Sequence, residues 1–123
     1  MITALDHILL ATPDRPEAAA AARRFFGTLL GLKEVPMPST LEGRAHCWFQ
    51  CGALTIHIGP EKDFRPAKKA HPAFLVADLN QVRAALEKEG HPIRADDAIQ
   101  DVRRFFSEDP WGNRLEFLQR VTE

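Results

Sequence analysis

The order of secondary-structure signals repeats along this 123-residue chain, and this repetition is the strongest constraint on its fold. In the first copy, an apolar strand at 5–11 precedes an Ala-rich helix at 17–30, and three shorter strands follow. In the second copy, a strand at 71–77 precedes a helix that starts at the N-cap Asp78 and ends at Gly90, and three strands follow again. Each half therefore reads β-α-β-β-β, which predicts an internal duplication.

Local signals set the expected boundaries of these elements. We expect the six shorter strands at 33–37, 45–51, 53–58, 91–95, 102–107 and 114–119. Asp14 is expected to cap the first helix, with Pro16 in its first turn, and Gly31 is expected to end it. We divide the chain into a first module at 1–60 and a charged linker with a second module at 61–123, which together make one domain.

Composition excludes several classes of protein. Sixteen Lys and Arg against seventeen Asp and Glu leave a formal charge of −1, so the basic surface of a nucleic-acid-binding protein is missing. No apolar run approaches the roughly 20 residues that span a bilayer, and no signal-peptide pattern opens the chain. The two cysteines, Cys47 and Cys51, would lie too far apart on one strand to form a disulfide. We therefore expect a cytoplasmic protein that binds neither membrane nor nucleic acid.

Four polar side chains, two in each half of the chain, are expected on the sheet face that the helix does not cover. The aliphatic side chains of the strands at 53–58 and 114–119 share one face, which a helix would cover, and His57 and Glu116 occupy the other. His7 and His71 take the same position on the two first strands. Three imidazoles and one carboxylate suit a divalent Zn, Ni, Fe, Co or Mn ion.

Simpler roles exist for each of these four side chains. A histidine on a strand can be a hydrogen-bonded core residue, and Glu116 can form a salt bridge with Arg114, two positions away on the same face. A carboxylate between Leu115 and Phe117 nevertheless requires some cation, because an unpaired buried charge is costly.

Further side chains are candidates for binding a substrate. Trp48 alternates with apolar neighbours on its strand and either lines the site or packs in the core. Arg104 and Arg114 are suited to bidentate contact with an anionic substrate, although each also fits an ordinary ion pair or a solvated arginine.

Four stretches of the chain resemble the vicinal oxygen chelate superfamily, which includes glyoxalase I, extradiol dioxygenases, fosfomycin-resistance enzymes and bleomycin-binding proteins. The stretches are Leu5-Asp6-His7-Ile8, Phe25-Phe26 with Leu30-Gly31-Leu32, the run from His71 to Leu79, and the run from Asp109 to Phe117. The last is the most specific, because it matches the superfamily's D-P-x-G-N-x-x-E strand. The resemblance implies an α+β fold in which two βαβββ modules form a curved mixed sheet with the helices on its convex face.

The resemblance also assigns roles to residues. His7 and His71 match the first-strand metal ligands of the two modules, and Glu116 matches the last-strand glutamate, which implies a ligand with a catalytic role. His57 stands where glyoxalase I usually has a second glutamate, so the sequence departs from the glyoxalase I pattern at this position.

Two functions from different classes are compatible with this resemblance. The first is a metal-dependent lyase, isomerase or dioxygenase that polarises a small-molecule substrate through two adjacent oxygens. The second is a metal-free ligand-binding or antibiotic-resistance protein similar to the bleomycin-binding proteins. We favour the enzyme, because all four ligand positions hold residues that can bind a metal. The resemblance further implies a homodimer.

Overall fold

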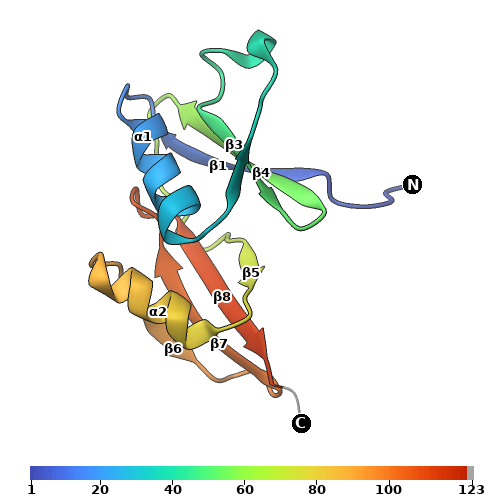
Figure 1. Ribbon diagram of the computed structural model, residues 1–123, viewed down its shortest axis with the longest axis vertical. Helices are drawn as coiled ribbons and strands as arrows, with labels where there is room; N and C mark the ends of the chain where they lie inside the picture. Colours follow the sequence, from blue (N-terminus) through green and yellow to red (C-terminus); the bar gives the residue numbers. More distant parts are fainter. Residues whose placement is uncertain (122–123) are drawn as a thin grey trace. The chain divides into compact units, whose positions relative to one another are not determined.

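The structure, a computed structural model, describes residues 1–121 of the chain (Figure 1). The chain divides into two compact units, Met1–Arg65 and Pro66–Glu123. We describe each unit by itself.

The first unit is a four-stranded sheet with one helical segment. Its elements are β1 (His7–Pro13), α1 (Ala18–Ala22), the π-helical η1 (Arg23–Leu29), β2 (Lys33–Val35), the short 3₁₀ helix η2 (Ser39–Leu41), β3 (Cys47–Cys51) and β4 (Leu54–Glu61). The strand order is β1-β4-β3-β2, with β1 parallel to β4 and the remaining pairs antiparallel. The parallel pair requires a crossover connection, which contains α1, η1 and the strands β2 and β3.

The second unit repeats this topology. Its elements are β5 (Ala73–Leu75), α2 (Leu79–Lys88), β6 (Arg94–Asp96), β7 (Val102–Glu108) and β8 (Arg114–Arg120). The strand order is β5-β8-β7-β6, again with the first and last strands parallel. The predicted duplication and the α+β class are therefore confirmed.

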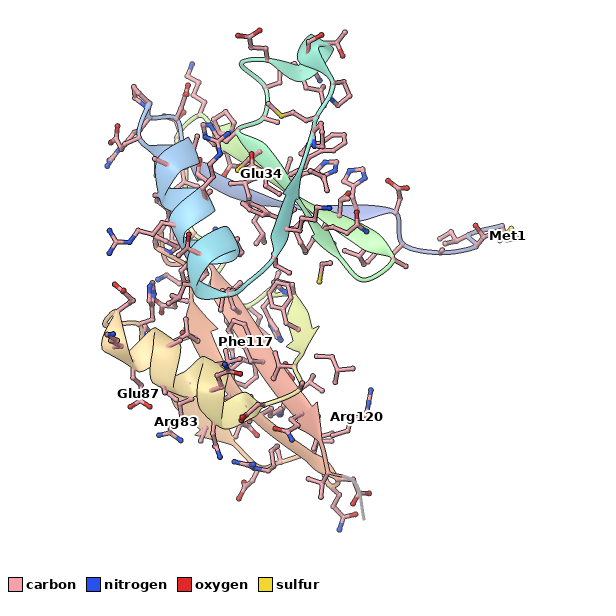
Figure 2. The ribbon with its side chains drawn as sticks, viewed as in Figure 1. Met1, Glu34, Arg83, Glu87, Phe117 and Arg120 are labelled. Carbon is pink, nitrogen blue, oxygen red and sulfur yellow. The ribbon has the colours of Figure 1, made fainter. Side chains whose placement is uncertain are left out.

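Aromatic and aliphatic side chains fill the core of each unit. In the first unit Phe26 of η1 packs near Phe49, and Ile56 and Ile58 of β4 are buried as well. In the second unit Phe117 of β8, labelled in Figure 2, is buried close to Phe105 of β7. The side chains of the predicted apolar face, Ile56 and Ile58 of β4 and Leu115 and Phe117 of β8, are buried as predicted. His57 and Glu116 on the opposite face are buried as well, so burial alone does not alternate along these strands.

The two helices begin differently. In α2 the Asp78 carboxylate accepts a hydrogen bond from the Gln81 amide at 3.2 Å, as predicted for an N-cap. The prediction of Asp14 as the cap of the first helix was wrong. β1 continues to Pro13, and the Arg15 amide donates to the Pro13 carbonyl in a turn, so that Asp14 lies four residues before the helix.

The first helix also changes its hydrogen-bonding pattern along its length. Its second part is π-helical, and the Leu30 amide donates to the carbonyl of Phe25, five residues back. The segment ends at Gly31, whose φ of +78° is the left-handed conformation predicted for this C-cap.

The strand expected at 53–58 does not end there but continues through Gly59 and Pro60. β4 continues through both residues to Glu61, because β1 remains paired with it along this length. The neighbouring β3 ends where Cys47 pairs with Ile58, so β4 has only one partner beyond that point. A proline is tolerated there because its missing N–H breaks no bond to a second strand.

No helix within residues 1–121 is both long and apolar enough to cross a membrane.

A buried carboxylate organises the turn between β7 and β8. Asp109 Oδ1 accepts hydrogen bonds from the amides of Trp111 and Asn113, at 3.0 and 2.9 Å, and Oδ2 accepts one from Asn113 Nδ2 at 2.7 Å. Asn113 Oδ1 in turn accepts a hydrogen bond from the Ala67 amide. Burial raises the pKa of Asp109 to about 6, although these hydrogen bonds act in the opposite direction.

This raised pKa predicts how the stability of the protein depends on pH. The folded state holds the Asp109 proton more tightly than the unfolded state, so the contribution of Asp109 to stability falls as the pH rises from about 4 to about 6. Because Asn does not titrate, the free energy of unfolding of the wild type relative to Asp109→Asn should decrease over this range. Urea unfolding of both proteins at several pH values measures this difference in the free energy of unfolding. A relative stability that rises with pH would mean that the hydrogen bonds outweigh burial.

Candidate functional site

Three aromatic rings form a column across the first sheet. The ring of His57 on β4 lies between the rings of Trp48 on β3 and His7 on β1. The centroid of His57 is 3.9 Å from that of Trp48 and 4.0 Å from that of His7, with interplanar angles of 4° and 10°. Trp48 and His57 are direct cross-strand partners, which brings their side chains together on one face. Trp48 therefore lies against His57 and lines the same cavity.

The environment of His57 favours the neutral form of its imidazole. Burial lowers the pKa of His57, and the neighbouring His7 lowers it further, while Asp6 acts in the opposite direction. A neutral imidazole retains a nitrogen lone pair, which is the form that binds a metal or accepts a proton.

Hydrogen bonds orient the two imidazoles. His7 Nδ1 lies 2.9 Å from Asp6 Oδ2, and His57 Nε2 lies 3.0 Å from Thr55 Oγ1. A carboxylate at Nδ1 favours the tautomer of His7 that is protonated there and leaves the Nε2 lone pair available. The two rings line a cavity of about 440 Å³, together with Leu9 and Arg44 among others.

The second sheet carries an imidazole and a carboxylate in direct contact. His71 lies two residues before β5, and its Nε2 is 2.9 Å from Oε1 of Glu116 on β8. The other ring nitrogen, Nδ1, is 2.8 Å from the carbonyl oxygen of Lys69. Both ring nitrogens thus face oxygen acceptors, and the contact with Glu116 requires a proton or another cation between the nitrogen and the oxygen.

The second oxygen of Glu116 is held by an arginine. Glu116 is only 6% exposed, and its Oε2 accepts a hydrogen bond from Arg104 Nη1 at 3.3 Å. Arg104 Nη2 also donates to Asp96 Oδ1 at 3.1 Å. Arg114, the alternative ion-pair partner suggested by its place on the same strand face, forms no salt bridge with Glu116. Arg104 reaches Glu116 from the neighbouring strand, and Arg114 lies over the ring of Phe106 instead.

The predicted ligands occur as one pair in each unit, His7 with His57 and His71 with Glu116. Within residues 1–121, no three His, Cys, Asp or Glu side chains are clustered closely enough to hold a metal ion.

Two neighbours of these pairs were missed in the sequence. Thr55 shares the face of His57 by strand alternation, which was sufficient to find it. Asp96 was missed because β6 was expected at 91–95 but runs from Arg94 to Asp96.

Solved structures of known proteins share this fold. The chain is 42% identical to a protein from Bacillus anthracis assigned to the glyoxalase family, with a TM-score of 0.87 and coverage of 98% of this chain and 97% of that one. A glyoxalase/dioxygenase from Nostoc punctiforme matches at 20% identity, with a TM-score of 0.74 and coverage of 94% and 90%. A lactoylglutathione lyase from Agrobacterium tumefaciens matches at 19% identity, with a TM-score of 0.70 and coverage of 97% and 95%. No protein-family model and no curated protein matches the chain.

The repeated βαβββ units define a protein of the glyoxalase/dioxygenase fold. With 42% identity over nearly its whole length, the chain belongs to the glyoxalase family, within the vicinal oxygen chelate superfamily.

The ring column predicts that Trp48 controls the pKa of His57. Removing the indole in Trp48→Ala exposes His57 to water, and because burial is the main cause of the lowered pKa, the pKa should rise toward 6.5. An NMR titration of the His57 ring protons measures this value, with Trp111→Ala as the control for loss of an indole elsewhere. An unchanged pKa in Trp48→Ala would show that the indole does not shield His57.

Proposed function

We propose that the protein is a metalloenzyme of the glyoxalase/dioxygenase type that acts on a small-molecule substrate. In this proposal His7, His57, His71 and Glu116 bind one divalent ion. The ion is Zn, Ni, Fe, Co or Mn. The contact between His71 Nε2 and Glu116 Oε1 carries the proposal, because a metal ion can take the place of the proton that this contact requires.

The donor atoms fit such an ion. Neutral imidazole nitrogens and a carboxylate oxygen are the ligands that these metals share. His71 has its Nδ1 held by the Lys69 carbonyl, and His7 has its Nδ1 held by Asp6. This leaves Nε2 of each ring for the metal, and such supporting hydrogen bonds are usual for histidine ligands.

When bound, the metal would polarise two adjacent oxygens of the substrate and stabilise the anion that forms. The protein supplies the remaining functions. Glu116 is the proposed catalytic carboxylate, and Arg104 fixes its Oε2. Trp48 keeps water from His57 on the other sheet.

Metal analysis tests this proposal. Protein purified without an affinity tag should contain a stoichiometric transition metal, measured by plasma mass spectrometry. His57→Ala and Glu116→Gln should each lose most of it, because each removes a ligand or its charge. His91→Ala, which removes an imidazole that is not a proposed ligand, is the matched control. A metal content that is the same in all four proteins would contradict the proposed ligand set.

One observation favours the second candidate, a metal-free ligand-binding protein. The salt bridge from Arg104, which is shared with Asp96, offsets part of the charge of Glu116 and weakens its attraction for a cation. If this candidate is correct, wild-type protein that has been dialysed against a chelator binds no divalent metal when one is supplied. The cavity beside Trp48 still binds an organic ligand.

We also propose that the protein acts in the cytoplasm and forms a homodimer. Leu9 and Leu75 are 55% and 65% exposed, and a partner chain would remove such apolar area from water. Sedimentation equilibrium should give about twice the 13.8 kDa of one chain, and Leu9→Glu should shift the distribution toward the monomer. Lys33→Glu introduces the same acidic side chain at a polar position and serves as the control. A single-chain mass for the wild type at all concentrations would rule out the dimer.

A further inference from the structure

Among the three arginines closest to Glu116 on the second sheet, one forms no salt bridge within the described residues. Of the three arginines on β6, β7 and β8 near Glu116, Arg94 pairs with Glu108 at 2.8 Å and Arg104 pairs with both Asp96 and Glu116. The third is Arg114, and within residues 1–121 no carboxylate lies within 4 Å of its guanidinium. Its cross-strand neighbour Glu108 is already paired with Arg94.

An aromatic ring holds this guanidinium in place. The Cζ atom of Arg114 lies 4.0 Å from the centroid of the Phe106 ring, and Phe106 itself is only 7% exposed. His71 packs edge-on against the same ring, with centroids 5.2 Å apart. A guanidinium over a ring gains cation–π energy and keeps the N–H groups at its edge available for a ligand.

Arg114 lies close to two of the proposed metal ligands, Glu116 and His71. Arg114 and Glu116 are two residues apart on β8, so their side chains leave the strand on the same face, with Cα atoms about 6.6 Å apart. The Phe106 ring contacts both Arg114 and His71, which places the guanidinium beside the His71–Glu116 pair.

We infer that Arg114 binds the carboxylate of an acidic substrate whose pair of adjacent oxygens lies at His71 and Glu116. The inference rests on the proposed function and adds the class of substrate, a small organic acid with its anionic group about three to four bonds from the oxygen pair. A carboxylate matches the one guanidinium of these three that forms no salt bridge. A phosphate dianion would require a second cation, and the two other arginines are already paired.

Two probes that differ only in the distal group test this inference. 2-Oxoglutarate and 2-oxopentanoate share the adjacent oxo and carboxylate oxygens and the chain length, but only the first carries a carboxylate at the far end. Isothermal titration of the nickel-supplied wild type should show tenfold or more tighter binding of 2-oxoglutarate. Arg114→Met, which keeps apolar cover over Phe106 but removes the charge, should abolish this preference. Arg114→Lys should keep part of it, because the charge remains without the two-pronged geometry.

The matched control is Arg120→Met, since Arg120 lies on the same strand and face but at its far end (Figure 2). This variant should retain the wild-type preference, and thermal melts of all variants should confirm that they are folded. Equal binding of the two probes by the wild type, or a preference that survives in Arg114→Met, would overturn the inference.

The same titration in chelator-treated protein separates this inference from the proposed function. A wild type that binds no nickel contradicts the proposed function. If no nickel binds, a preference for 2-oxoglutarate that disappears in Arg114→Met still supports anion binding by Arg114. If the wild type shows no such preference, anion binding by Arg114 is refuted.

Discussion

The buried carboxylate of Glu116 is the constraint on which the account depends. A strand that places a glutamate between Leu115 and Phe117, both in the core, brings a charge to a position where water reaches little of it. The structure compensates this charge at both oxygens, with the ring of His71 at one and the guanidinium of Arg104 at the other. The cost of an unpaired charge explains why these two side chains converge there.

The duplicated unit gives the same strand position different chemistry in the two halves. His57 on β4 and Glu116 on β8 occupy the last strand of their units, and each lies beside a histidine from the start of its own unit. In the first unit the pair is two imidazoles, which repel each other when charged and are covered by an indole. In the second unit the pair is an imidazole and a carboxylate, which attract each other. One half therefore favours neutral donors, and the other holds the negative charge.

The sequence was sufficient for the order of elements and for the face on which each candidate ligand lies, because both follow from periodicity and from turn residues such as Asp78 and Gly31. The sequence was insufficient where contacts between distant segments set the length of a strand or the partner of a side chain. β4 extends through Pro60 because β1 accompanies it, and no local signal reports this. The partner of Glu116 was misjudged for a related reason, since Arg104 approaches from another strand, whereas the sequence offered only Arg114 on the same strand.

The most direct test of the central claim, that four side chains bind one metal ion, is anomalous X-ray scattering from crystals of protein that was never exposed to a chelator. We expect a single transition-metal peak within bonding distance of His71 Nε2 and a Glu116 carboxylate oxygen, with the imidazoles of His7 and His57 completing the protein ligands. Crystals without an anomalous peak, in which Arg104 still holds Glu116 and His71 still contacts it directly, would contradict the account.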